Sequence, residues 1–210
     1  MSNNPYLTTK GIVLRETNYG ESSKMLTVFS GDYGLITVSA KGVRKIKSKI
    51  RPLSQIFCYS EIELYKSKGD IYTLTGGRVI ESFYGIASDM DAFNVSGKII
   101  RVLLSVLQPN LPDPESMRLT LNALHYLSVG SRMPRLVQVI FVIHFMLLQG
   151  MLPDTEVILS EYGVSLSAGA IKALAHITES EMDNLFRFTV SATILEELES
   201  LCEYLERAYN

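Results

Sequence analysis

The apolar residues change their spacing once, near residue 82, and this change limits the possible folds more than any other feature of the sequence. Before it, apolar and polar side chains alternate within short segments, as in "CYSEIELY" at 58–65. A period of two is typical of β-strands. After it, apolar residues recur every three or four positions, as in "FNVSGKIIRVLLSVL" at 93–107, which is typical of helices. We therefore expect a β-domain over residues 1–80 and an all-helical domain over residues 81–210.

The N-terminal region contains about five strand-like segments joined by short turns. "GDYG" at 31–34 lies between "KMLTVFS" and "LITVSAKG" and predicts a hairpin. Gly76 and Gly77 predict a bulge in the last strand. Closure of so short a sheet removes its exposed edges. We therefore expect a small closed or nearly closed five-stranded barrel.

Capping residues mark the ends of the predicted helices. Asp113 and Pro114 predict the start of a helix that ends at Gly130. Thr178 with Glu181 fits a capping box, and the last helix is predicted over "TILEELESLCEYLERAY". These signals divide residues 81–210 into several short helices.

The most apolar segment is "VQVIFVIHFMLL" at residues 137–148. It is 12 residues long, whereas a membrane span needs about 20 apolar residues. We interpret it as a buried core helix, with His144 as a hydrogen-bonded core residue. No membrane segment and no signal peptide are expected.

Charge is distributed unequally between the two predicted domains. Residues 1–80 contain twelve Lys or Arg and six Asp or Glu, a net charge of +6. Residues 81–210 contain eight and sixteen, a net charge of −8. A basic domain joined to an acidic one suggests that the two have different partners, and the basic domain suits a polyanion.

The segment "SAKGVRKIKSKIR" at 39–51 holds half of the basic residues of the first domain and no acid. Its like charges repel one another unless an anion offsets them, and nucleic-acid phosphates would do so. We predict that Gly42 shapes the end of a strand. The predicted phosphate contacts, two of them from adjacent strands, are Arg15, Lys24, Lys41, Arg44, Lys45, Lys47, Lys49 and Arg51. The candidate base-stacking residues are Tyr19, Tyr33, Tyr59, Tyr65 and Tyr72, although core or edge packing explains most of them equally well.

Catalytic and metal-binding motifs are not found. The sequence has no G-x-S-x-G elbow, no Walker A loop and no H-E-x-x-H. Its two cysteines and three histidines lack the paired spacing of zinc ligands. Cys58 and Cys202 lie far apart, which fits a reducing, cytoplasmic compartment better than a disulfide framework. We expect no enzyme activity, no cofactor, no metal and no small-molecule substrate.

The residues from 10 to 86 resemble the N-terminal domain of the bacterial RecO family. The matching elements are a strand ending in "VL", then "YGE", an apolar strand ending in "FS", and "AKG-x-R" followed by a basic stretch containing "KS". "FMLLQGMLPD" and "LSAGAIKAL" are similar to segments of the family's helical region. The resemblance implies an OB-fold domain followed by an all-helical domain.

The resemblance also implies a function. It implies ATP-independent binding of single- and double-stranded DNA, annealing of complementary strands, and an association with the bacterial nucleoid. It implies two protein partners, RecR and the C-terminal tail of the single-stranded DNA-binding protein, which together help to load RecA. An acidic tail needs cations beside an apolar groove, and Arg132 and Arg135 are the candidates in the helical domain.

Two departures from the family pattern bear on these expectations. Many members carry two C-x-x-C pairs between the two helical segments, where this chain has "TEVILSEYGVS" at 155–165. We therefore expect a variant without the zinc module and without structural zinc. The sequence given also stops at "YLERAYN", before the basic tail common in the family.

Two alternative functions remain open at this point. In one, the chain is a protein–protein adaptor whose basic barrel loop binds an acidic protein. In the other it is a nuclease, although no carboxylate cluster accompanies the basic segment.

Overall fold

The structure is a computed structural model that describes residues 5–66, 69–154, 157–158 and 166–208 of the 210-residue chain. The chain divides into two compact units. The first comprises Met1–Phe83 and Val106–Arg118, and the second comprises Tyr84–Ser105 and Leu119–Asn210. A short segment of the helical region therefore belongs with the N-terminal unit.

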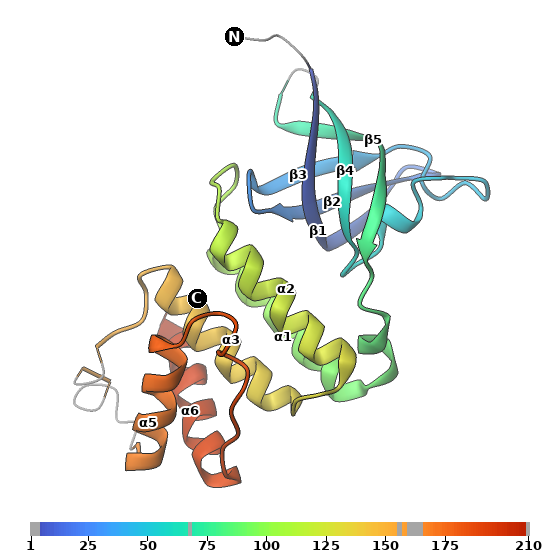
Figure 1. Cartoon of the computed structure of the whole chain (residues 1–210). Coiled ribbons are helices and arrows are strands. Elements are labelled where there is room, and N and C mark those ends of the chain that lie inside the picture. The colour runs from blue at the N-terminus through green and yellow to red at the C-terminus, as the bar shows by residue number, and fades with distance from the viewer. Residues whose placement is uncertain (1–4, 67–68, 155–156, 159–165, 209–210) are drawn as a thin grey trace. The chain divides into compact units, whose positions relative to one another are not determined.

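Five strands of the first unit form a closed barrel (Figure 1). The strands are β1 (Tyr6–Tyr19), β2 (Ser23–Ser30), β3 (Gly34–Ala40), β4 (Tyr59–Lys66) and β5 (Ile71–Glu81). Their order around the barrel is β1-β2-β3-β5-β4. All neighbours are antiparallel except β3 and β5, which pair in parallel. This is an OB-fold barrel, so the predicted fold class is confirmed, as is the hairpin at 31–34.

The long strand β1 closes the barrel by pairing on both sides. Its second half pairs with β2 and its first half with β4. Gly11 lies where the two pairings overlap, and a Cβ there would lie 2.6 Å from Val28 Cγ1. The register shifts between Val13 and Arg15, which increases the bend of the strand. A second shift opposite Thr75 lies beside the bulge that Gly76 predicts.

The barrel interior is filled by alternate side chains of its strands. Val13, Leu26, Val38 and Leu64 are each at most 3% exposed and belong to one apolar cluster. Tyr72 is in the same cluster, at 4% exposed. Its proposed base-stacking role is therefore wrong, because its ring is occupied by core packing.

Residues 108–113 extend the barrel's hydrogen bonding beyond the strands. The Leu35 amide donates to the Gln108 carbonyl at 3.4 Å, and the Asn110 amide donates to the Leu35 carbonyl at 3.2 Å. The Asp113 amide donates to the Gly31 carbonyl at 2.9 Å. These bonds connect residues 108–113, which lie far away in sequence, to Leu35 of β3 and to the turn before that strand, and no local pattern in the sequence indicates them.

Two short 3₁₀ segments lie at Pro52–Ser54 and Tyr84–Ser88, and the α-helices in the described parts of the chain all follow β5. They are α1 (Met90–Val106), α2 (Pro114–Val129), α3 (Pro134–Leu148), α5 (Ala168–Glu179) and α6 (Ala192–Ala208). The Ser116 amide donates to Asp113 Oδ1 at 3.0 Å, and Gly130 follows α2 with φ of +67°. The predicted ends of α2 are therefore confirmed.

Helix α3 forms the core of the helical unit and packs against α5 and α6. Ten of its fifteen residues are buried, including His144, whose Nδ1 lies 2.8 Å from the Ile177 carbonyl. That carbonyl lies in the last turn of α5, where no intrahelical donor remains. Of the helices in the described parts of the chain, none combines the length and apolarity that a membrane span requires. The core-helix prediction is confirmed.

The capping-box prediction at Thr178 and Glu181 is wrong. Thr178 lies inside α5, and its hydroxyl donates back to the Leu174 carbonyl at 3.1 Å. The preceding apolar positions continue to Ile177, which is fully buried, so the helix extends through the threonine. The last helix begins at Ala192, after Ser191.

Candidate nucleic-acid interface

The basic segment forms a loop that leaves β3 at Ala40 and reaches β4 at Tyr59. The loop after β3 projects at the right of the barrel in Figure 1. Gly42 adopts φ of +66° where the chain turns out of the strand, which a glycine accepts without strain. Every cation of the loop is exposed, namely Lys41, Arg44, Lys45, Lys47, Lys49 and Arg51.

Apolar residues within the same loop anchor it to the barrel. Val43 is 1% exposed and Leu53 is 4% exposed, and both belong to the barrel's core cluster. Ile50 packs against that cluster from its edge. The loop therefore inserts apolar side chains into the end of the barrel and holds its cations in solvent. This spacing of apolar residues was visible in the sequence, but the charge pattern alone does not reveal its role.

Backbone and guanidinium hydrogen bonds order the loop further. The Arg44 amide donates to the Ser22 carbonyl at 2.8 Å, which joins the loop to the β1–β2 turn. Arg51 Nη2 donates to the Arg44 carbonyl at 2.9 Å and to the Lys45 carbonyl at 3.4 Å. One cation of the segment thus stabilises the backbone that carries two others.

Three of the predicted phosphate contacts surround one hollow of about 380 Å³. Lys24, Arg44 and Arg51 line it, together with Asn18 and Gln55. Lys24 also pairs with Glu16 at 2.6 Å, so part of its charge is already balanced. Arg44 and Arg51 face no acid in this hollow's lining. Positive charge with few acids in a concave site suits a phosphate group.

A second hollow, of about 460 Å³, differs in character. Tyr19, Met25 and Ile71 line it with Lys41. Tyr19 is 64% exposed and Ile71 is 48% exposed. The remaining lining residues come from β3, from β5 and from the turn between β4 and β5, and they include one acid, Asp70, so the hollow has no net excess of positive charge. An exposed ring and aliphatic surface beside one lysine suit a nucleobase whose phosphate lies nearby.

The other predicted contacts line neither hollow. Arg15 is exposed on β1, and Lys45, Lys47 and Lys49 extend from the loop into solvent. Tyr33 is 36% exposed at the β2–β3 turn, and Tyr65 is engaged in an edge contact with Tyr6 at 5.1 Å.

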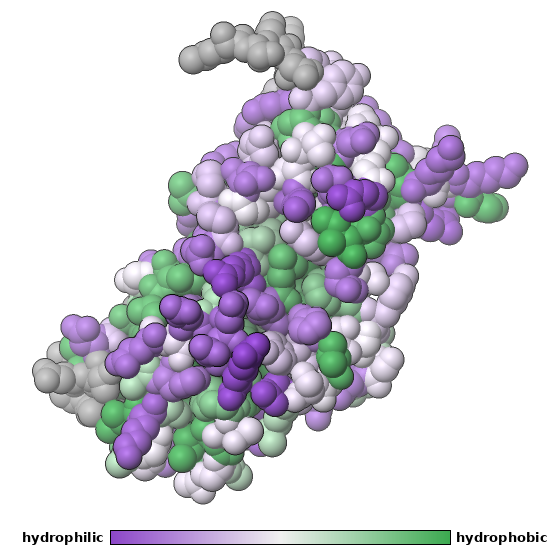
Figure 2. Space-filling view, in the orientation of Figure 1, coloured by the Kyte–Doolittle hydropathy of each residue, from purple (hydrophilic) through white to green (hydrophobic). Residues whose placement is uncertain are grey.

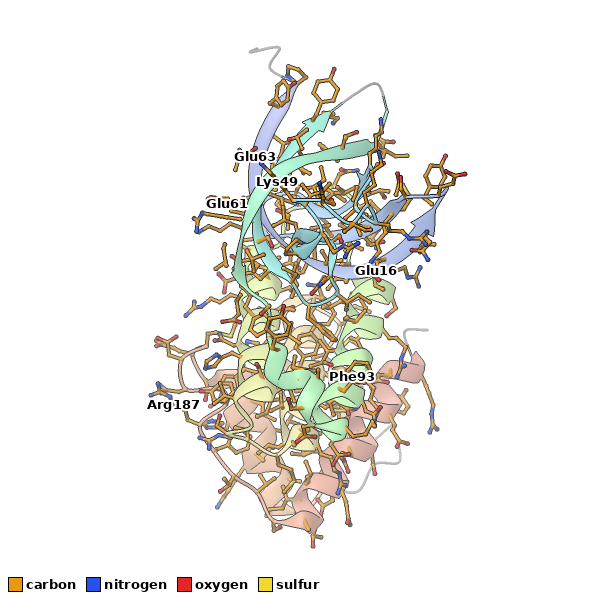
Figure 3. The ribbon with its side chains drawn as sticks, turned by 90° about the vertical axis from the view of Figure 1, so that its right-hand side faces the viewer. Glu16, Lys49, Glu61, Glu63, Phe93 and Arg187 are labelled. Carbon is orange, nitrogen blue, oxygen red and sulfur yellow. The ribbon has the colours of Figure 1, made fainter. Side chains whose placement is uncertain are left out.

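Acidic residues mark the outer face of β4. Glu61 and Glu63 alternate with the buried Ile62 and Leu64 on β4, so their side chains lie on its outer face (Figure 3). Glu61 pairs with Arg78 of β5 at 2.8 Å. Glu63 is exposed beside this ion pair, so the outer face of β4 suits a phosphate chain less well than the acid-free loop does.

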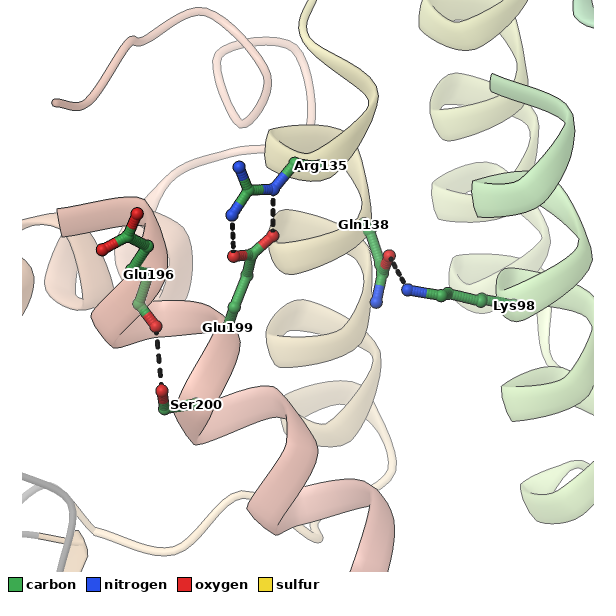
Figure 4. A network of polar contacts seen from close by, with 6 residues as sticks. All are labelled: Lys98, Arg135, Gln138, Glu196, Glu199 and Ser200. Carbon is green, nitrogen blue, oxygen red and sulfur yellow. Dashed lines mark hydrogen bonds and ion pairs between the residues drawn. The ribbon is translucent and has the colours of Figure 1, made fainter. Parts of the chain in front are cut away.

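In the helical unit, Arg132 and Arg135 both have intramolecular partners. Arg132 Nε donates to the Phe186 carbonyl at 2.7 Å, and its guanidinium lies 5.9 Å from the centroid of the Tyr126 ring. Arg135 forms a two-bonded ion pair with Glu199 of α6 (Figure 4). Hydrogen bonding to Glu199 raises the pKa of Arg135. The two arginines thus contact different elements.

Within the described residues, no three His, Cys, Asp or Glu side chains are placed to hold a metal ion. Residues 155–165, where many family members carry two C-x-x-C pairs, lie outside the described residues except for Val157 and Ile158. The absence of structural zinc therefore stays a prediction.

Comparison with known proteins places this barrel in a family. Residues 1–83 match the family model described as "Recombination protein O N terminal". A protein of Acetivibrio thermocellus named "DNA repair protein RecO" is 34% identical over 92% of this chain and 87% of its own length. The chain belongs to the RecO family. RecO proteins of Caldicellulosiruptor bescii (39% identical over 68% of this chain and 57% of the relative) and Dehalococcoides mccartyi (28%, over 91% and 85%) are also similar.

Membership of the RecO family carries a role in DNA repair and recombination. It also agrees with the OB-fold barrel described above. In this RecO chain, the basic loop and the two hollows are the candidate surfaces for contact with DNA.

Proposed function

We propose that the chain binds single- and double-stranded DNA through the loop at 41–51, and that it promotes the annealing of complementary strands and the loading of a recombinase. No chemical step is part of this function. The observation that carries the proposal is an ordered loop whose cations all face solvent while Val43 and Leu53 hold it in the barrel core.

Charge neutralisation is the proposed mechanism of annealing. Two DNA strands repel each other through their phosphates, and cations that contact both strands lower this repulsion. Lys45, Lys47 and Lys49 extend from the loop, whereas Arg44 and Arg51 line the hollow beside it. Such an arrangement offers contacts to more than one backbone segment. Each neutralised phosphate releases counterions, so the affinity must fall with salt.

Base contacts in a single strand are assigned to the hollow beside Tyr19. The aromatic ring is exposed, and stacking of a base on such a ring contributes about 1–3 kcal/mol without sequence preference. Lys41, in the lining of the same hollow, would contact the adjoining phosphate. Sequence-tolerant binding is what annealing of arbitrary strands requires.

The proposed protein partners are RecR and the C-terminal tail of the single-stranded DNA-binding protein. Arg132 and Arg135 remain the proposed cations for the acidic tail. Because Glu199 already occupies the guanidinium of Arg135, carboxylates of the tail would have to displace it.

The test is a titration of fluorescently labelled single-stranded DNA at two salt concentrations. We expect the wild type to bind at low salt and to lose affinity as salt rises. With about six phosphate contacts on a single strand, the loss between about 50 mM and about 200 mM salt is about 300-fold. A variant with Lys45, Lys47 and Lys49 changed to Glu should bind far more weakly, with a smaller dependence on salt.

A matched control separates the loop from overall charge. Lys172, Arg187 and Arg207 are exposed and lie in the helical unit, so changing all three to Glu alters the net charge equally. We expect this control to retain most of the affinity. Equal losses in both variants would contradict the loop as the site. If the wild type binds no DNA but does bind an acidic protein through the loop, the adaptor function replaces the proposal.

A further inference from the structure

Ile46 is exposed at the most basic part of the chain. It is 93% exposed, more than any other large apolar side chain in the described parts of the chain. Its neighbours Arg44, Lys45 and Lys47 are exposed as well. Figure 2 shows a small apolar patch within the hydrophilic surface that projects from the barrel at the right.

A hydrogen-bonded turn holds Ile46 at the tip of the loop. The Ser48 amide donates to the Lys45 carbonyl at 3.0 Å, which closes a four-residue turn with Ile46 and Lys47 at its centre. The Arg51 guanidinium donates to the carbonyl of the first residue of this turn, Lys45. The isoleucine is therefore presented on an ordered tip, not on a free chain end.

The position of this isoleucine has no explanation inside the folded chain. Turn centres favour Gly, Pro, Asn, Asp and Ser, because these residues either fit the backbone or bond to it. Burial of an isoleucine side chain stabilises a fold, and Ile46 gains almost none of this stabilisation. Val43 and Ile50 of the same loop do pack on the barrel core. Ile46 is thus available to bury its side chain in a partner.

The surrounding cations restrict what that partner is. It must present negative charge at its surface and an apolar interior within reach of one side chain. Duplex DNA does so, because its stacked bases lie between two phosphate backbones. Single strands are bound on aromatic rings, which stack on bases, whereas an aliphatic side chain has no such face. Aliphatic side chains act instead as wedges between base pairs of a duplex.

We propose that Ile46 inserts as an apolar wedge between adjacent base pairs of duplex DNA, while Lys45 and Lys47 contact the flanking phosphates. This proposal rests on DNA binding by the loop, as proposed above. Unstacking one base step costs free energy, which burial of the isoleucine and the charge contacts offset. The consequence is a locally unstacked step at the site of binding, a property that phosphate contacts alone would not produce.

The test uses a duplex with 2-aminopurine at an internal position, whose fluorescence is quenched by stacking and rises when the step opens. Anisotropy of a distant label reports binding in the same sample. At saturation we expect a severalfold fluorescence rise with the wild type and with Ile46→Leu. With Ile46→Ser we expect most of the rise to be lost. Its duplex affinity should fall by less than about tenfold, because phosphate contacts supply most of the binding.

Val129→Ser is the matched control, because Val129 is a β-branched residue that is 61% exposed in the helical unit. It should behave as the wild type. Thermal melting should be unchanged in Ile46→Ser, since the side chain makes almost no buried contact. A saturated wild-type complex without a fluorescence rise, or an equal rise with Ile46→Ser, would overturn the wedge while leaving DNA binding intact. Absence of any anisotropy change with the wild type would overturn both proposals.

Discussion

Gly34 lies at the start of β3, beside the backbone of Leu111 in the segment that extends the barrel. Its φ is +65°, and a Cβ would lie 2.2 Å from the Leu111 carbonyl oxygen. Gly34→Ala should therefore displace this segment and lower the free energy of unfolding by about 2–4 kcal/mol. Urea unfolding, followed by circular dichroism, measures this change.

Gly20→Ala is the control for backbone strain at the same scale. Gly20 has φ of +59°, but no atom lies within 4 Å of the position that a Cβ would take there. It should lose only the strain energy of a left-handed residue, about 1–2 kcal/mol. If both substitutions lower the free energy of unfolding equally, contact between a Cβ at residue 34 and Leu111 is not the cause of the loss.

The two cysteines allow a second prediction for single residues. Cys58 and Cys202 are each 2% exposed, and burial raises the pKa of both thiols. Folding therefore favours the protonated thiol. The stability this contributes is fully present below the ordinary value of 9.0 and is lost as the pH rises through the raised values.

A thiol-specific reagent checks this prediction. Neither cysteine should react in the native protein at pH 8, because both thiols are buried and protonated. Two equivalents should react in denaturant, matching the two cysteines of the chain. Rapid labelling of the native protein would contradict the buried placement of the reacting thiol.

At the scale of elements, the loop at 41–51 depends on Arg51 for part of its order. Arg51→Lys keeps the charge but loses the geometry with which Nη2 contacts the carbonyls of Arg44 and Lys45. Loss of about 1 kcal/mol raises the population of open loop about fivefold. We expect trypsin to cleave the loop correspondingly faster, while the salt dependence of DNA binding stays the same.

Arg78→Lys is the matched control, because Arg78 is an exposed barrel arginine that contacts the side chain of Glu61. Exposed ion pairs of this kind contribute little. Its loop should be cleaved at the wild-type rate. If Arg51→Lys is cleaved no faster than this control, the guanidinium does not order the loop.

At the scale of the whole molecule, the family resemblance raises the question of zinc. We predict that the purified protein contains no stoichiometric zinc and that a chelator leaves its melting temperature unchanged. The reason is chemical, since zinc modules need four closely spaced ligands and residues 155–165 contain neither Cys nor His. Elemental analysis decides the matter, and one zinc per chain would refute the prediction.

Much of the fold was predictable because it follows from local patterns. The alternation of apolar and polar residues predicted that side chains such as Leu26 and Leu64 fill the barrel. The glycines of "GDYG" predicted the hairpin that joins β2 and β3. The error at Thr178 has the opposite origin. A threonine three residues before a glutamate resembles a cap locally, but burial of Ile177 in the helical core extends the helix past it.

The candidate site was also predictable only in part from the sequence. Its cations were evident from the sequence, since six of them lie within 11 residues without an acid. The hollow between Lys24, Arg44 and Arg51 was not, because it depends on how the loop folds against the β1–β2 turn. The exposure of Ile46 and the burial of Tyr72 could not be predicted from the sequence either, since both residue types occur in the interior and on the surface of proteins.

The sequence by itself determined the order of strands and helices, the concentration of positive charge in residues 39–51 and the resemblance that membership of the RecO family confirmed. These properties depend on neighbouring residues. Only the tertiary structure decided which apolar residues of the loop enter the barrel and which one faces solvent. It also decided that residues 108–113 complete the hydrogen bonding of β3. Such contacts join residues distant in sequence, and packing against a shared core selects them.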